Sequence, residues 1–178
     1  DMAATFKLNE DSTFNFFYAY GAVDRFADGS FTVSGNQVIL KSSKQPGNDF
    51  SVDKQYSQND ELVIEIKNNN TLLASNVLCI CVKGEERQEF YADKKGKINA
   101  GKNAYDKVYL QHLFYPDIPT LIRDSTNKNN YFEVSLKPSL ERISFKGIDL
   151  TIYENTLTCL PNYFMPFEKI VFVKQKEE

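Results

Sequence analysis

The sequence predicts an all-β protein, an antiparallel β-sandwich with a small N-terminal β-meander. Apolar side chains alternate with polar ones at a period of two along most of the apolar segments, which is the pattern of strands with one buried face. Strand and turn together recur every eight to twelve residues or so, with roughly the spacing of sandwiches and barrels. No amphipathic window of helical period has a useful length, so little helix is expected.

Composition narrows the class of protein. The 178 residues suffice for one domain or two small ones, and 42% are hydrophobic, so a packed core is expected. The net charge of -3 comes from acidic and basic residues that are well interspersed. Without a basic stripe that neutralises phosphates, nucleic-acid binding is disfavoured. No apolar run approaches the ~20 residues of a membrane-spanning helix, so no transmembrane segment is expected.

The N-terminal part is predicted to be a β-meander. Thr13–Tyr20 alternates as one strand, with Phe and Tyr side chains gathered on one face. A turn region is expected at residues 22–29, followed by short strands at Ser30–Val33 and Val38–Ser42. Between these strands, Gly35 and Asn36 suit the positive φ of a tight hairpin turn.

A second series of strands is predicted in the middle of the chain. Val77–Val82 is apolar on both faces, which favours a central strand covered on two sides. The strands expected here are 62–66, Val77–Val82, Gln88–Ala92 and Lys107–Tyr115, with turns over Asn68–Asn70 and Asp93–Gly96.

Residues 116–130 are the least strand-like, and one helical turn is expected at 121–123. Strands then resume at Tyr131–Leu136, Ser144–Phe145, Asp149–Tyr153, Thr156–Leu160 and Lys169–Lys174.

The domain boundary is placed in Ser51–Asp60, which is polar and has no strong periodicity. Residues 1–52 are predicted to form the N-terminal β-meander subdomain, and residues 53–178 the β-sandwich domain.

The hairpin Asp28–Ser42, DGSFTVSGNQVILKS, resembles a hairpin of lipocalin-like bacterial lipoprotein domains. Gly29 and Phe31 stand where those domains commonly have Gly-x-Trp, and a Gly-Asn turn follows. The resemblance covers this hairpin alone and implies no site.

Residues 61–110 are similar to the transthyretin-like or carboxypeptidase-regulatory sandwich, here called prealbumin-like. The similarity lies in the order of the segments LVIEI, KNNNT, VLCICV, FYADKKGKI and KVYL. Those modules carry a Thr-Asp-x-x-Gly turn, of which Asp93 and Gly96 are kept while Ala92 replaces the Thr. The resemblance implies a seven-stranded sandwich that serves as a non-catalytic accessory or adhesion module of bacterial envelope proteins. It brings no active-site residue to this chain, and a fold alone does not determine a function.

Three cysteines leave two alternatives open. Cys79 and Cys81 point to the same face of a strand, so a disulfide between them would distort an extended backbone. Either Cys159 bonds to one of them, or all three are buried and reduced. With one His and no Cys-x-x-Cys pair, the ligand set of a metal site is missing, and no cofactor is expected.

His112 is the one side chain whose unperturbed pKa lies near neutrality, so conventional acid–base catalysis would need it. It shares a strand face with apolar residues, which favours a histidine satisfied in the core or at its edge. A catalytic role would need a nucleophile and an orienting carboxylate, and Cys159 with Asp117 is the combination that we consider. No catalytic residue is predicted.

Aromatic residues give the sharpest candidate surface. The stripe Phe14–Phe16–Tyr18–Tyr20 is either a recognition surface or the packing of a small core against the following hairpin and the second β unit. A second cluster spans residues 163–167 between two predicted strands, where it either packs on a core or contacts a partner. The binding residues predicted from these clusters are Tyr18, Tyr20, Phe164 and Phe167.

The sequence thus favours a non-catalytic binding or structural module. Its expected partner is a protein, a peptide or an apolar small molecule. A lipocalin-like carrier of a small apolar ligand is the alternative, and a hydrolase that uses His112 is a distant third. Because the sequence starts DMAATF, we expect a removed leader, with a lipid anchor in the precursor, although a trimmed terminus has the same form. The expected location is therefore bacterial and secreted, periplasmic or outer-membrane-anchored.

Overall fold

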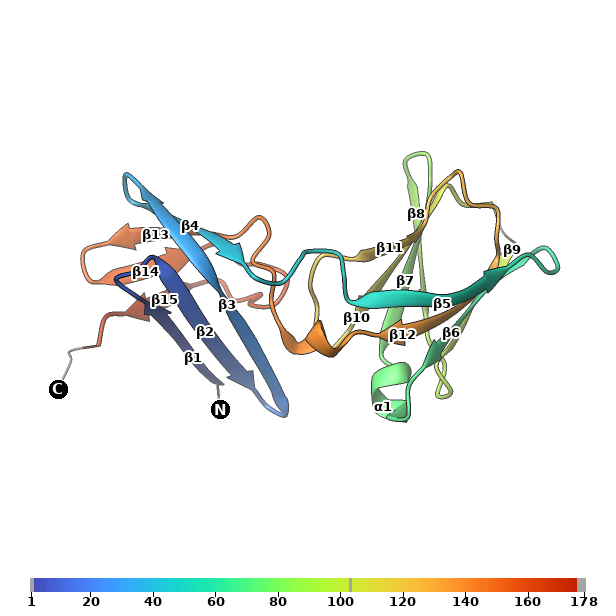
Figure 1. The fold of residues 1–178 in the computed structure, drawn as a ribbon, viewed down its shortest axis with the longest axis horizontal. Helices are drawn as coiled ribbons and strands as arrows, with labels where there is room; N and C mark the ends of the chain where they lie inside the picture. Colours follow the sequence, from blue (N-terminus) through green and yellow to red (C-terminus); the bar gives the residue numbers. More distant parts are fainter. Residues whose placement is uncertain (1, 103, 176–178) are drawn as a thin grey trace. The chain divides into compact units, whose positions relative to one another are not determined.

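The computed structural model describes residues 2–102 and 104–175, and it confirms the all-β fold. The chain forms two compact units (Figure 1). Unit 1 comprises residues 1–46 and 141–178, and unit 2 comprises residues 47–140. Unit 2 is therefore inserted between two parts of unit 1. No helix in the described part of the chain is long and apolar enough to cross a membrane.

Unit 1 is one antiparallel seven-stranded sheet in the order β1-β2-β3-β4-β13-β14-β15. The first and last strands of this order approach each other, so the sheet is nearly closed into a barrel. Its strands are β1 (Met2–Leu8), β2 (Thr13–Tyr20), β3 (Val23–Ser34), β4 (Gln37–Ser42), β13 (Asp149–Tyr153), β14 (Thr156–Cys159) and β15 (Ile170–Val173).

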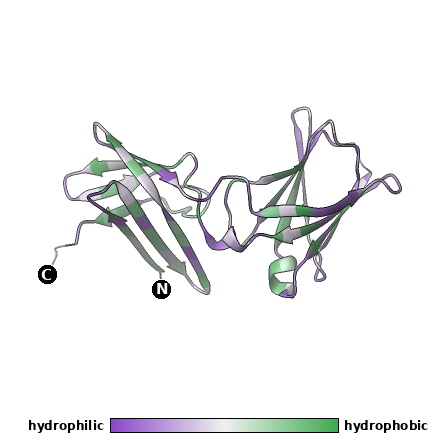
Figure 2. Cartoon of the chain, viewed as in Figure 1, coloured by the Kyte–Doolittle hydropathy of each residue, from purple (hydrophilic) through white to green (hydrophobic). Residues whose placement is uncertain are grey.

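Strand β2 has the predicted bounds because its alternation is strict. Phe14, Phe16 and Tyr18 are buried, while Thr13, Asn15 and Phe17 on the other face are exposed. Figure 2 shows alternating hydrophobic and hydrophilic residues as bands along the strands of both units. The stripe packs against Phe145 and Phe164 from the C-terminal part of the chain, and Phe31 and Leu40 of the following hairpin pack on the same cluster, as expected.

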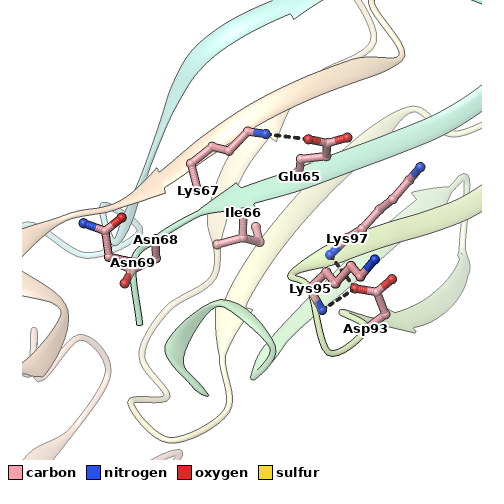
Figure 3. Close-up of a pocket in the computed structure, with 8 residues that line it drawn as sticks. All are labelled: Glu65, Ile66, Lys67, Asn68, Asn69, Asp93, Lys95 and Lys97. Atoms are coloured by element: carbon pink, nitrogen blue, oxygen red, sulfur yellow. Dashed lines mark hydrogen bonds and ion pairs between the residues drawn. The ribbon is translucent and has the colours of Figure 1, made fainter. Parts of the chain in front are cut away.

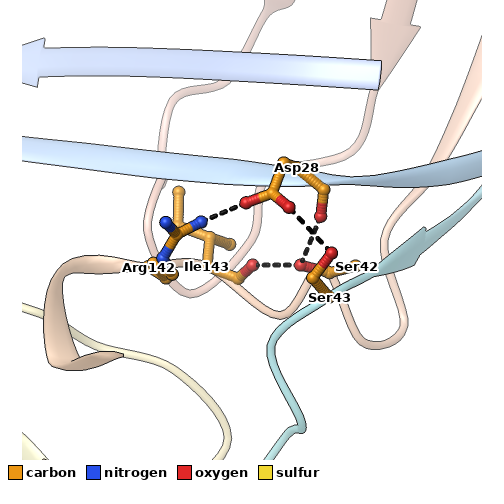
Figure 4. A network of polar contacts seen from close by, with 5 residues as sticks. All are labelled: Asp28, Ser42, Ser43, Arg142 and Ile143. Atoms are coloured by element: carbon orange, nitrogen blue, oxygen red, sulfur yellow. Dashed lines mark hydrogen bonds and ion pairs between the residues drawn. The ribbon is translucent and has the colours of Figure 1, made fainter. Parts of the chain in front are cut away.

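A polar network joins β3 and β4 to the segment that follows residue 140 (Figure 4). The Asp28 carboxylate pairs with Arg142 and accepts a hydrogen bond of 2.8 Å from the Ser43 hydroxyl. The Ser42 hydroxyl donates to the carbonyl of Ile143 at 2.7 Å. These contacts hold the returning chain beside β3, where Ile143 and Phe145 enter the core.

Unit 2 consists of two four-stranded sheets around one core, a sandwich-like arrangement. The first sheet has the order β11-β10-β7-β8, and the second has the order β5-β12-β6-β9, in which β12 and β6 run parallel. The strands are β5 (Phe50–Tyr56), β6 (Glu61–Lys67), β7 (Val77–Lys83), β8 (Glu86–Tyr91), β9 (Lys97–Lys102), β10 (Lys107–His112), β11 (Thr120–Arg123) and β12 (Tyr131–Leu136).

Strand β7 is central in its sheet, as predicted, between β10 and β8. Both of its faces are buried from Val77 to Cys81. A one-turn helix α1 (Thr71–Ala74) precedes it, and the Asn70 side chain caps that helix by accepting from the backbone N–H groups of Leu72 and Leu73. A 3-10 turn, η1 (Pro138–Glu141), follows strand β12.

Several expectations need correction. Residues 121–123 belong to strand β11 and not to a helical turn, since they pair with β10. The turn region expected at 22–29 is the first half of β3, a strand long enough to pair with both β2 and β4. Ser144–Phe145 forms no strand; Phe145 instead has φ of 53° and turns its ring into the core.

The predicted division at residue 52 also differs from the compact units. Strand β13 pairs with β4 in register Val38–Leu150, so the last part of the chain completes the N-terminal sheet instead of the sandwich. Strand β5, which begins before the predicted boundary, pairs with β12 of unit 2.

Candidate functional site

The four residues predicted to bind a partner come together at one end of unit 1. Tyr18 and Tyr20 lie two residues apart on β2, and Phe164 and Phe167 lie in the segment between β14 and β15. The rings of Tyr18 and Phe164 meet edge-on with centroids 5.8 Å apart. The rings of Tyr20 and Phe167 meet in the same way at 6.2 Å. The prediction placed all four at a surface, but only the second pair reaches it.

The inner pair is part of the core. Tyr18 and Phe164 are each 5% exposed. Burial, with the nearby Tyr20, raises the pKa of Tyr18 above that of a free tyrosine. The buried Arg25 guanidinium lies 6.0 Å from the Phe164 ring centroid and donates to the carbonyls of Glu141 and Arg142. The inner pair is thus held by packing and by a fixed cation.

The outer pair lies at the rim of the sheet. Tyr20 is 57% exposed and Phe167 is half-buried. Met2 on β1 pairs with Tyr20 in the strand register and is 55% exposed. We call Met2, Tyr20 and Phe167 the rim patch. Its two rings contact each other and lie on the same two segments as the buried pair Tyr18 and Phe164.

Aromatic rings fill the interior of unit 1. Phe16 has the rings of Phe6, Phe145, Phe164 and Phe172 around it, with centroids between 4.5 and 6.3 Å away. Most of these contacts are edge-to-face, the arrangement that aromatic side chains favour. A ligand inside the sheet would have to displace these rings.

His112 lies in the core of unit 2 and is fully buried. Its Nε2 is 3.1 Å from the carbonyl of Leu73, and its Nδ1 accepts a hydrogen bond of 3.2 Å from the Phe114 N–H. This pattern assigns the proton to Nε2 and a neutral ring. The two contacts tie β10 to α1 and to the chain after β10, a structural use of the imidazole.

The three cysteines are free in the structure. Cys79 and Cys81 are buried side by side on β7 with their sulfur atoms 3.6 Å apart, and Cys159 is half-buried on β14. Cys159 belongs to unit 1 and the other two to unit 2. The hydrogen bond with Cys81, together with burial, raises the pKa of Cys79, and burial raises that of Cys159.

A polar groove of about 770 Å³ opens on unit 2 (Figure 3). It lies between the end of β6 with the loop after it and the turn that leads into β9. Seven of the eight lining side chains are polar: Glu65, Lys67, Asn68, Asn69, Asp93, Lys95 and Lys97, with Ile66 the apolar one. Among the described residues, no group of three or more His, Cys, Asp or Glu side chains is arranged to hold a metal ion.

Comparisons with protein-family models, with curated proteins and with solved structures found no match to this chain.

Sequence reasoning missed both the Met2 part of the rim patch and the groove. The sequence predicts only a turn at Asp93–Gly96, although three lysines within residues 93–97 indicate a local positive charge. Met2 carried no such signal, because its place beside Tyr20 depends on the pairing of β1 with β2.

Proposed function

We propose that this chain is a non-catalytic module of the bacterial envelope or secreted space, and that its rim patch binds an extended peptide segment of a protein partner. The observation that carries the proposal is the contact between Tyr20 and Phe167. Tyr20 is exposed and Phe167 is half-buried, their rings contact each other edge-on, and they lie on the same two segments as the buried Tyr18–Phe164 pair. Aromatic anchors held in place before binding lose little conformational entropy on association.

Strand β1 supports an extended peptide as the partner. It stands at the end of the sheet order, so within the described residues one backbone edge of Met2–Leu8 has no named strand paired to it. Because Phe6 farther along β1 contacts Phe172 of β15, the part of this edge that we propose accepts an added strand through main-chain hydrogen bonds is the Met2 end. Met2 lies opposite Tyr20, so a peptide along this edge would bring an apolar side chain to the rim patch.

The packed interior of unit 1 favours this function over that of a lipocalin-like carrier. A carrier needs an enclosed apolar cavity, whereas the space beside Phe16 is occupied by rings of the chain itself. The hydrogen bonds of His112 to Leu73 and Phe114 likewise favour a structural histidine over a hydrolase. Secretion, a lipid anchor and a prealbumin-like relationship of unit 2 remain part of the proposal.

Selection of displayed peptides on the whole chain tests this function. We expect selected peptides to be rich in apolar and aromatic residues, and to lose about tenfold or more in affinity for Tyr20→Ala and Phe167→Ala, since aromatic anchors dominate such interfaces. Tyr153→Ala is the matched control, because Tyr153 is 68% exposed in the same unit and lies outside the rim patch. Peptides that bind all variants equally, or binding of a fluorescent fatty acid instead of peptides, would contradict the proposal.

A further inference from the structure

The turn Asp93–Lys97 is held rigidly against β6 and α1. The Gly96 carbonyl accepts the Ile66 N–H at 2.8 Å, and the Asp93 N–H donates to the Lys97 carbonyl at the same distance. Gly96 has φ of +78°, and a Cβ there would lie 2.9 Å from the Cβ of Ala74. A residue with a side chain would therefore not fit, and the backbone that presents Lys95 and Lys97 is fixed.

Both carboxylates of the groove are already occupied. Glu65 pairs with the Lys67 ammonium at 2.6 Å, which lowers the pKa of Glu65 and raises that of Lys67. The Asp93 carboxylate accepts the backbone N–H groups of Lys95 and Lys97 at 2.8 and 2.9 Å, and these bonds lower its pKa. Asp93 also interacts electrostatically with the ammonium groups of Lys95 and Lys97, and Glu65 with that of Lys97, but within the described residues no ion pair joins them in direct contact.

The ammonium groups of Lys95 and Lys97 are donors that remain for a ligand. Within the described residues, no hydrogen bond or ion pair involves the Nζ atoms of Lys95 and Lys97, and the dashed lines of Figure 3 end at their backbone nitrogens. The side-chain amides of Asn68 and Asn69 line the opposite part of the groove. Three lysines against two carboxylates give the groove a net charge of +1 on a chain whose net charge is -3.

We propose that this groove binds an acidic saccharide, with a carboxylate or sulfate group on Lys95 and Lys97 and sugar hydroxyls on the amides of Asn68 and Asn69. The groove, of about 770 Å³, is lined by eight residues, enough to contact a ligand larger than a lone anion. A single surplus charge suits a ligand with few anionic groups, and it does not suit the dense phosphates of a nucleic acid. This site lies in unit 2 and is independent of the rim patch in unit 1.

Isothermal titration of the whole chain tests the site with four probes: a digalacturonate, a sulfated disaccharide, cellobiose and inorganic phosphate. We expect one or both acidic disaccharides to bind and cellobiose and phosphate to bind at least about tenfold more weakly, because charge-assisted contacts and hydroxyl contacts act together. Raising the salt concentration to about 0.5 M weakens the binding, because it screens exposed charges.

Single variants locate the ligand. Lys95→Ala and Lys97→Ala are each expected to weaken binding by about five- to tenfold, as removal of a charge-assisted contact does. Lys94→Ala removes the same charge from the same turn at an exposed position outside the groove, and is expected to bind like the wild type. Tyr20→Ala is also expected to bind normally, so a failed peptide selection leaves this test unaffected.

Four outcomes would overturn the proposal. Equal binding of cellobiose would remove the role of charge, and phosphate binding as tight as that of the disaccharides would reduce the site to a simple anion site. Unchanged affinity in both Lys95→Ala and Lys97→Ala would place the ligand elsewhere. Tighter binding of a single-stranded oligonucleotide than of either acidic disaccharide would make nucleic acid the ligand instead.

Discussion

Phe6 of β1 and Phe172 of β15 meet edge-to-face with ring centroids 5.0 Å apart, although their strands stand at opposite ends of the sheet order. This contact closes the core of unit 1 where the two strands are not paired with each other in the sheet. Aromatic packing between side chains, and not backbone pairing, therefore completes the barrel-like sheet.

The two faces of β2 differ in their contribution to stability. Phe16→Ala is expected to lower the free energy of unfolding by about 3–5 kcal/mol, because it leaves a cavity among packed rings. Phe17→Ala on the next position is the control: Phe17 is 37% exposed and contacts Phe26 on the outer face, so about 1 kcal/mol is expected. Urea denaturation measures both values. Equal losses would contradict the burial of Phe16.

Gly29 is required by close packing of two backbones and not by its own φ. A Cβ at this position would lie 2.1 Å from the carbonyl oxygen of Lys41 on β4. Gly29→Ala is expected to cost about 3 kcal/mol or more, as backbone displacement does. Gly21→Ala, at φ of +62° with open space around it, should cost only about 1–2 kcal/mol. A larger loss of stability for Gly21→Ala than for Gly29→Ala in thermal or urea denaturation would show that β3 and β4 separate more easily than the packing implies.

Tyr131 links stability to alkaline pH. Burial, and then a hydrogen bond with Glu65, raise its pKa in the folded protein well above that of an unfolded tyrosine, which is about 10. Above that pH the unfolded chain loses the proton while the folded chain keeps it, so the free energy of unfolding falls as pH rises. Tyr131→Phe keeps the ring stacked on Tyr56 and should make this fall less steep. Urea denaturation at several pH values above 9 measures the slope, and an unchanged slope would exclude the effect.

The cysteines should react in a fixed order. A thiol reagent is expected to modify the half-buried Cys159 in the native protein, and to reach Cys79 and Cys81 at least about a hundredfold more slowly, because they need an opening of unit 2. In denaturant all three should react. Mass spectrometry of the labelled peptides reports the order, with Cys159→Ser as the control that removes the fast site. Fast modification of Cys79 in the native chain would contradict the packing of β7.

Local periodicity was enough to predict the strands that carry their own signal. β2, β12 and β13 have the predicted bounds, because alternation or β-branched content continues over their whole length. The turn at Gly35 is confirmed as well, with φ of +60° between Ser34 and Gln37, which pair directly, whereas Asn36 does not have the positive φ expected of it.

Edge positions explain strands that were missed. β1, β5 and β9 each stand at the end of a sheet order, where fewer side chains are buried and polar residues are tolerated. Pairing between distant segments was also out of reach. Nothing local in Val38 or Leu150 states that they lie opposite each other, yet this register decides the division into units.

The candidate site, like the fold, was predictable only where local alternation indicated the position of a side chain. Alternation placed Tyr18 and Tyr20 on one face, but it could not show that the strand leaves the core between them. Phe164 and Phe167 lie in a segment without periodicity, so no local pattern indicated that Phe164 is buried and Phe167 half-buried; Asn162 accepts the backbone N–H groups of Phe164 and Met165 in this segment.

The insertion of unit 2 within unit 1 sets an order of folding during synthesis. Residues 47–140 leave the ribosome as a complete unit, whereas β1–β4 must wait for β13, β14 and β15 before their core is covered. A nascent or truncated chain that stops before Asp149 thus retains the whole sandwich. In unit 1, however, it exposes the edge of β4 that pairs with β13, and the buried phenylalanines of β2 lose their cover. Loss of the C-terminal strands therefore makes unit 1 prone to aggregation and has little consequence for unit 2.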